Sequence, residues 1–238
     1  MKANIRFFVA LGLASTIFFS CDKKDKNNGD NNLPDNPAYI IKASDVENST
    51  EQVKTVKGIT YINNEEYFIS SAEYKDKGFS LELPAPVSDS LLMRIGDDFT
   101  EASTISVSDL DARILSVDQI KGYDANGEHL GYFEYGNTDI ANTIWVYADR
   151  DLSITGQELE SDEDEVYNIT YEVSVKKGWN ILYFYSSETT DPETEITTYN
   201  EKITSTQNPA ITLSWSFYGF MVERPAKTVQ KSIFKLKK

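Results

Sequence analysis

The chain has 238 residues with 38 acidic and 23 basic side chains, so its formal net charge is −15. Such an acidic chain repels phosphate backbones, which argues against nucleic acid as a partner. One His and one Cys cannot form a multi-histidine or zinc-thiolate site, and the sequence contains no H-E-x-x-H, Walker A or G-x-G-x-x-G motif, so no cofactor or metal is predicted.

The N-terminal segment has the features of a secretory leader. Lys2 and Arg6 precede an uncharged run over residues 7–20, which as a helix would be about 21 Å long and too short for a bilayer core of about 30 Å. The only Cys, Cys21, follows the small residue Ser20. This arrangement resembles the lipobox of bacterial lipoproteins, and the resemblance implies that the Cys21 thiol carries fatty acyl chains. A plain cleaved signal followed by an incidental Cys is the alternative.

If Cys21 is acylated, the body has no disulfide and no Cys nucleophile. Residues 21–39 are rich in Asn and Asp and poor in apolar side chains, which predicts a disordered tether spanning about 20–25 Å. The predicted location is therefore the outer membrane of a bacterial envelope, and the sequence leaves open whether the body faces the periplasm or the cell surface.

From residue 40 onward the composition favours strands, with 14 Tyr and 12 Phe beside many Thr, Ile and Val. Residues 53–62 and 67–74 flank Asn63-Asn64-Glu65-Glu66 and predict a hairpin. Alternation over residues 79–83 predicts a half-buried strand. Ser88 is then the expected N-cap of a short helix over residues 91–95.

Residues 114–123 and 129–135 are strand-like and flank a segment that contains Asn126-Gly127, a strong turn signal. A calcium loop is the less favoured alternative there, because the EF-hand spacing is absent. The single histidine, His129, follows this turn and is expected at the surface. No G-x-S-x-G elbow accompanies it.

Residues 143–148 are apolar on both faces, and a strand resumes over residues 152–155. The acidic segment GQELESDEDE that follows predicts a solvated hairpin loop, with a cation site as the alternative. Apolar side chains alternate without exception over residues 167–176, which is typical of an antiparallel strand with one wet face. Residues 179–185 are apolar on both faces and predict a central strand.

Residues 194–204 and 211–217 complete the predicted body. At the C-terminus, Ile233, Phe234 and Leu236 lie among lysines and predict an edge strand that the lysines protect. A patch that binds anionic lipid or polysaccharide is the alternative there.

The aromatic side chains of two predicted strands are the strongest candidates for a ligand-binding surface. If the aliphatic faces of two strands form the core, the opposite faces would carry an outer platform for sugar rings, formed by Trp145, Tyr147, Trp179, Tyr183 and Tyr185. The alternative is that both faces are buried and these rings lie in a sandwich core.

Two stretches, WVYADRDLSITG and VSVKKGWNILY, resemble a pattern in uncharacterised Bacteroidota envelope lipoproteins, as does GFSLELPAPVSDSLL upstream. The resemblance covers about residues 53–220. It implies an exported, all-β protein and supplies no catalytic residue.

The predicted fold is an antiparallel β-sandwich over residues 40–238, with two lobes (40–136 and 142–238) as one arrangement and a closed barrel as the alternative. The leading functional hypothesis is a lipid-anchored, non-enzymatic binding or interaction module, with a glycan or an envelope protein as partner. A structural subunit of a surface complex is the second hypothesis. The third is a glycoside hydrolase that uses two carboxylates.

Overall fold

The computed structural model describes residues 39–97, 104–137, 140–161 and 165–220. The leader, Cys21, residues 162–164 of the acidic segment and the C-terminal lysines lie outside these ranges. Within them the elements are strands and two 3₁₀ turns, which confirms the prediction of an all-β fold with antiparallel sheets. No helix in the described ranges combines the length and apolar character that a membrane span needs.

In chain order the strands are β1 (Tyr39–Ala43), β2 (Thr55–Ile62), β3 (Glu65–Glu73), β4 (Phe79–Leu83), β5 (Met93–Arg94), β6 (Ile105–Val107), β7 (Arg113–Val117), β8 (Gln119–Tyr123), β9 (His129–Gly136), β10 (Ala141–Ala148), β11 (Leu152–Ser161), β12 (Glu165–Val175), β13 (Gly178–Thr190), β14 (Thr197–Thr204) and β15 (Ser214–Gly219). Two 3₁₀ turns, η1 (Asp89–Leu91) and η2 (Ile95–Asp97), flank β5.

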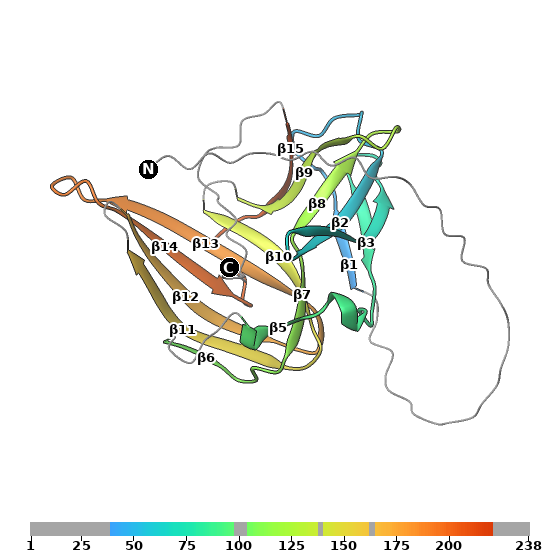
Figure 1. The fold of residues 1–238 in the computed structure, drawn as a ribbon. Coiled ribbons are helices and arrows are strands. Elements are labelled where there is room, and N and C mark those ends of the chain that lie inside the picture. The colour runs from blue at the N-terminus through green and yellow to red at the C-terminus, as the bar shows by residue number, and fades with distance from the viewer. Residues whose placement is uncertain (1–38, 98–103, 138–139, 162–164, 221–238) are drawn as a thin grey trace, which may run out of the picture. The chain divides into compact units, whose positions relative to one another are not determined.

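These strands form an eight-stranded sheet, a five-stranded sheet and the pair β1–β4 (Figure 1). The eight-stranded sheet has the order β5-β7-β10-β13-β14-β12-β11-β6, and the five-stranded sheet has the order β15-β9-β8-β2-β3. Every ladder among them is antiparallel except β12–β14. Each of the two larger sheets contains strands from both sides of residues 136–141, so the boundary considered between two lobes does not separate these sheets.

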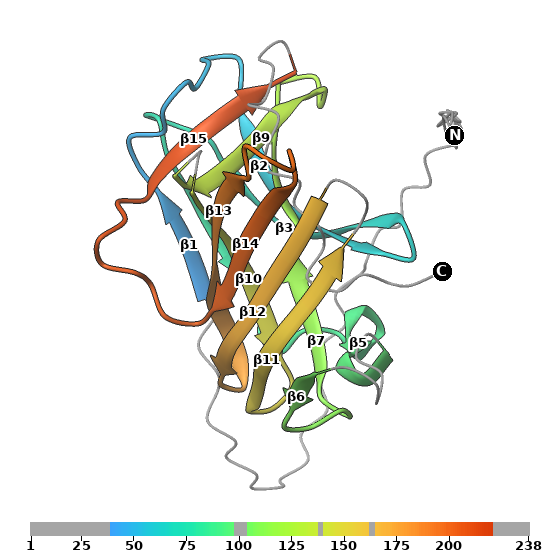
Figure 2. The same ribbon diagram turned by 90° about the vertical axis from the view of Figure 1, so that its left-hand side faces the viewer.

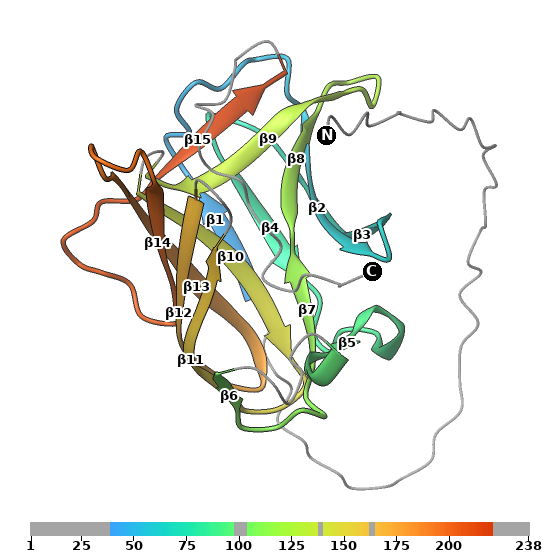
Figure 3. The same cartoon turned by 60° about the vertical axis from the view of Figure 1, so that its left-hand side comes forward.

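The eight-stranded sheet curls, so that β6 and β7 meet at one end although they lie far apart in strand order (Figure 3). Figure 2 shows the neighbouring strands β13, β14, β12, β11 and β6 side by side. Gly156 permits the approach of β6, since its φ is +135° and a Cβ there would lie 2.5 Å from the Thr104 carbonyl oxygen. The concave face buries an apolar cluster that includes Val146, Tyr171, Val173, Leu182 and Ile203.

The main core lies between the layers. Trp145 and Val117 of the eight-stranded sheet pack with aromatic residues of the five-stranded sheet and with aliphatic residues of the β1–β4 pair, among them Phe133, Trp215, Phe217, Ile41 and Leu81. The convex side of the curled sheet is therefore covered along part of its width by a second layer, as in a sandwich.

The local turn signals are confirmed. Asn63 and Asn64 both have positive φ values, 52° and 65°, and connect β2 to β3 as a two-residue hairpin turn. In the β8–β9 turn, a carboxylate oxygen of Asp124 accepts hydrogen bonds from the backbone N–H groups of Asn126 and Glu128, each 2.8 Å long. The Asp124 side chain is thus used to hold the turn.

Two strands of the eight-stranded sheet match their patterns well. Strand β12 buries alternate apolar side chains, and β13 lies between β10 and β14 as expected of a central strand. Strand β13 continues past Tyr185 to Thr190, because its exposed polar end still pairs with β14. Most of the acidic segment is also strand: residues 157–161 belong to β11 and pair with β12.

Three predictions are corrected. Residues 91–95 are not a helix, because Met93 and Arg94 pair with β7 at the sheet edge, and Ser88 makes no side-chain capping bond. Residues 114–123 are two strands in different sheets, which separate at Asp118. Tyr39 is not part of the tether, since it begins β1 and pairs with Leu83.

Candidate binding groove

The five aromatic residues predicted as a platform do not share one open surface. Trp145 and Tyr147 are each 5% exposed and Tyr183 is 9% exposed. These three rings are buried because the five-stranded sheet and its flanking elements cover this face of β10 and β13. For them the sandwich-core interpretation is correct and the outer platform is wrong.

Trp179 and Tyr185 are half-buried and have defined partners. The indole N–H of Trp179 donates to the Pro84 carbonyl oxygen over 2.7 Å, and its ring meets Tyr147 edge-on at 5.6 Å. The Tyr185 hydroxyl accepts a hydrogen bond from the backbone N–H of Asn208. Both rings therefore hold loops against the sheet.

A stack of three rings joins the sheets. Trp215 lies between Trp145, with planes 5° apart and centroids 5.7 Å apart, and Tyr135, with planes 31° apart and centroids 5.2 Å apart. The indole N–H of Trp215 donates to the Lys42 carbonyl oxygen over 3.1 Å. This bond gives the buried indole N–H its hydrogen-bond acceptor and connects β15 to β1.

A groove of about 500 Å³ opens beside this stack. It is lined by aromatic and aliphatic side chains that include Tyr39, Ile40, Tyr135 and Ile181, and the almost fully buried Trp145 and Trp215 border it. Its rim carries exposed polar side chains, Lys42, Ser44, Asp45 and Glu47. Aromatic side chains beside exposed polar groups give the groove surfaces for both apolar and hydrogen-bonding contacts with a ligand.

A second cavity of about 140 Å³ shares Glu47 and Ser214 with the groove. It is lined mainly by polar side chains, including Glu134, Asn137, Asn142, Ser216 and Tyr218. The two spaces together offer hydrogen-bond donors and acceptors next to half-exposed tyrosines.

Tyrosine hydroxyls gather at the same end of β13. The pKa of Tyr183 is raised, first by burial and then by the neighbouring hydroxyls of Tyr135, Tyr185 and Tyr39. A tyrosine hydroxyl can both donate and accept hydrogen bonds, so Tyr39 and Tyr135 give the groove lining both kinds of partner.

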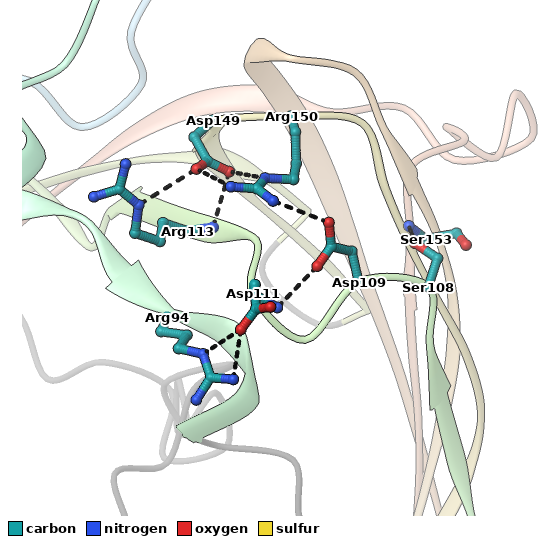
Figure 4. Close-up of polar contacts among 8 residues, drawn as sticks. All are labelled: Arg94, Ser108, Asp109, Asp111, Arg113, Asp149, Arg150 and Ser153. Carbon is teal, nitrogen blue, oxygen red and sulfur yellow. Dashed lines mark hydrogen bonds and ion pairs between the residues drawn. The ribbon is translucent and has the colours of Figure 1, made fainter.

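A charged network holds the β6–β7 connection at the far end of the curled sheet (Figure 4). The carboxylate of Asp149 accepts two hydrogen bonds from the Arg150 guanidinium, at 3.0 and 3.1 Å, and one from the Arg113 backbone N–H at 2.9 Å. Arg150 also donates to Asp109 over 3.1 Å, and Arg94 donates to Asp111 over 2.6 Å. Because these opposite charges pair directly, we interpret the network as a structural clamp.

A half-buried carboxylate, that of Asp118, lies where the chain crosses between the sheets. Asp118 accepts hydrogen bonds from the Tyr61 backbone N–H, at 2.7 Å, and from the hydroxyls of Thr60 and Ser116. Burial raises the pKa of Asp118, and these hydrogen bonds offset part of that effect. The carboxylate oxygens of Asp118 thus hold the segment that passes from one sheet to the other.

Nothing in residues 39–97, 104–137, 140–161 or 165–220 groups three or more His, Cys, Asp or Glu side chains so that they could hold a metal ion. His129 is half-buried rather than fully exposed, and its ring packs against Tyr123, Tyr132 and Phe220.

Comparison of this chain with protein-family models, curated proteins and solved structures finds no significant match. The functional argument therefore rests on the residues themselves.

Sequence reasoning found Trp145 but missed the groove to which it contributes. Tyr39 was assigned to the tether, and Tyr135 is one aromatic among many in a strand. Trp215 carried a usable signal, because it shares an apolar face with Phe217, but its partner in the other sheet is 70 residues away.

Proposed function

We propose that this chain is a lipid-anchored, non-enzymatic binding module of a bacterial cell envelope, and that the groove beside Tyr39 and Tyr135 takes a saccharide. The anchor is inferred from the leader and from the position of Cys21. The observation that carries the binding proposal is the groove itself, which the half-buried rings of Tyr39 and Tyr135 line beside exposed polar side chains.

A saccharide suits this chemistry for two reasons. Sugar rings present apolar faces that pack on aromatic side chains, and their hydroxyls need both donors and acceptors. Tyr39 and Tyr135 supply ring surface, while Lys42, Asp45 and Glu47 supply a donor and acceptors at the rim. The acidic surface of the chain makes a neutral or cationic saccharide more compatible than a polyanionic one.

The binding proposal is tested on the mature chain with Cys21→Ser, which keeps the protein in solution, against a glycan panel. Tyr39→Ala and Tyr135→Ala should each weaken the best ligand by about fivefold or more, since an aromatic contact contributes about 1 kcal/mol. Tyr67→Ala, on the distant β2–β3 hairpin, is the matched control and should bind as the parent does. Absence of any ligand, or equal binding by all variants, would refute the proposal.

The anchor is tested separately by metabolic labelling with a fatty-acid analogue. The wild-type chain should incorporate label, and Cys21→Ala should not. Equal labelling of both chains, or of neither, would contradict the anchor without bearing on the groove.

A second candidate function, an assembly subunit of a surface complex, is favoured by the second edge of β1, where no strand of the described residues pairs although the Trp215 indole N–H donates to the Lys42 carbonyl oxygen. Among the described residues β1 pairs only with β4, and residues 39–42 line the groove. An extended segment of a partner protein could add to such an edge. A stoichiometric protein recovered from detergent extract, and competed by no glycan, would support this role over the first.

The hydrolase hypothesis requires two facing carboxyl groups about 5–10 Å apart. Acidic side chains do gather on the concave face of the curled sheet, and a different role is argued for them below.

A further inference from the structure

One end of the concave face of the eight-stranded sheet carries carboxylates and tyrosines in place of the aliphatic cluster. Residues paired across a ladder point to the same side of a sheet. Ile169, which belongs to the concave apolar cluster, pairs with Glu158 on one side and Glu201 on the other. Both glutamates therefore lie on the concave face.

The strand pairing places a further set of residues on the same concave face. Tyr167 pairs with Glu160 of β11 and with Tyr199 of β14, and Tyr199 pairs with Glu188 of β13. Glu165 lies two residues before Tyr167, on the same face, and accepts a hydrogen bond from its hydroxyl over 2.7 Å. We call these residues the concave acidic end: Glu158, Glu160, Glu165, Tyr167, Tyr171, Glu188, Tyr199 and Glu201.

The side chains of this surface lie close together. The Tyr167 and Tyr199 rings stack with centroids 4.8 Å apart, and the Tyr171 hydroxyl lies 3.4 Å from a carboxylate oxygen of Glu158. A hydrogen bond to Glu165 is the main cause that raises the pKa of Tyr167 to about 12. Burial and then the charges of Glu158, Glu201 and Glu160 raise the pKa of Tyr171. The surface thus combines concentrated negative charge with aromatic faces.

The chain itself contains a segment of complementary chemistry. Residues 221–238 lie outside the described ranges and carry six Lys or Arg residues against one Glu, with Ile233, Phe234 and Leu236 among them. The rest of the protein is strongly acidic, so this segment is the exception in charge. Its 18 residues can extend about 60 Å, which exceeds the diameter of about 40 Å expected for a body of this size.

We propose that residues 221–238 dock on the concave acidic end of the same chain, with lysines against its carboxylates and apolar side chains against Tyr167 and Tyr199. A polycation that competes for the same carboxylates should displace the docked segment. Opposite charges concentrated on two surfaces of one chain favour this contact at ordinary ionic strength.

Zero-length carbodiimide cross-linking of the intact mature chain with Cys21→Ser, at low micromolar concentration, tests the contact. Peptide mapping should find links from Lys231, Lys235, Lys237 or Lys238 to the concave glutamates, within monomers. Exposed carboxylates on other elements, at Glu51, Glu73, Glu82 and Glu128, are internal controls and should yield few links. Links spread evenly over the controls, or links that join two chains, would overturn the proposal.

Limited trypsin digestion gives an independent readout. The triple variant Glu160→Gln/Glu188→Gln/Glu201→Gln should release the tail at least about fivefold faster, because cleavage follows the population of the undocked form. The control Glu51→Gln/Glu73→Gln/Glu82→Gln removes the same charge elsewhere and should be cleaved at the parental rate. Circular dichroism checks that both variants are folded. Equal cleavage rates in parent, variant and control would also overturn the proposal, and neither result depends on a groove ligand.

Discussion

The Trp145 ring of the eight-stranded sheet stacks on the Trp215 ring of the five-stranded sheet, with their planes 5° apart. Both rings are almost fully buried, and both also border the candidate groove. The contact that joins the two layers therefore also supports the side chains that line this groove. Substitutions there should change stability and binding together, which is why the binding test above uses the lining residues Tyr39 and Tyr135.

Trp215→Ala should destabilise the fold by about 3–5 kcal/mol, because it leaves a large cavity between the layers. Trp215→Phe keeps an aromatic ring, so its packing loss should be smaller than that of Trp215→Ala. Loss of the hydrogen bond to the Lys42 carbonyl oxygen should cost about 1 kcal/mol more. Urea unfolding followed by circular dichroism measures both changes. A cost below about 1 kcal/mol for Trp215→Ala would show that the stack does not join the layers.

Asp118→Ala should cost about 1–3 kcal/mol, since it leaves the donors of Thr60, Tyr61 and Ser116 without their acceptor. Asp118→Asn keeps an acceptor for Tyr61 and should be far milder. Burial raises the pKa of Asp118, so the folded state binds its proton more tightly than the unfolded state. This carboxyl therefore lowers stability as the pH rises from about 3.8 through its folded-state pKa.

Urea unfolding midpoints of the parent and of Asp118→Asn, measured between pH 4 and pH 7, test this pH dependence. The stability of the Asn variant relative to the parent should rise toward neutral pH, because only the parent carries the half-buried carboxyl that must ionise. A constant difference across this range would mean that the Asp118 pKa is not raised.

His129→Phe should flatten the pH dependence of stability below pH 6.5. Burial lowers the pKa of His129 from its ordinary value of 6.5, and a hydrogen bond with the Gly131 carbonyl oxygen opposes this effect in part. As the pH falls through 6.5 the unfolded state takes up its proton first, so the parent loses stability. Unfolding midpoints at pH 5 and pH 7 measure the effect, and an equal pH slope in parent and variant would contradict it.

Asp149→Ala should loosen the β6–β7 connection, because Arg113 and Arg150 lose their shared carboxylate. We expect a loss of about 1–2 kcal/mol, reduced by solvent around the guanidinium groups, and faster amide hydrogen exchange over residues 105–112. Asp97→Ala removes an exposed partner of Arg94 and should change neither quantity. If both variants exchange alike, the network does not act as a clamp.

The Asp149 contribution also has a defined pH range. Burial alone would raise the pKa of this carboxyl, but hydrogen bonds and charges from Arg150 and Arg113 outweigh it and lower the pKa. The stabilisation is therefore present above about pH 3.8 and disappears as the pH falls through the folded-state pKa.

Patterns of short range were predictable from the sequence. Alternation defined β12, apolar side chains on both faces placed β13 in the sheet interior, and Asn63-Asn64 and Asn126-Gly127 marked hairpin turns. Each of these signals is set by neighbouring residues, so no knowledge of the rest of the fold is needed.

Features that depend on distant partners were not predictable. Residues 93–94 form a strand because they pair with β7 at the edge of the sheet. Residues 114–123 divide into two strands at Asp118, because the first part pairs in the eight-stranded sheet and the second part in the five-stranded sheet. The parallel pairing of β12 with β14 has no local signature either. The aromatic faces of β10 and β13 were misjudged for the same reason, since only the second layer determines which side is dry.

The exchange of strands between the layers limits how the polypeptide can be divided. β5 and β7 precede residue 136 yet complete the eight-stranded sheet, while β15 comes near the end yet completes the five-stranded one. A cut between residues 136 and 141 leaves strands of both larger sheets on each fragment, so complementation of two such fragments would have to rebuild both layers at once. Epitope tags or fluorophores are better inserted at the exposed Asn63-Asn64 turn, where the two flanking strands already end.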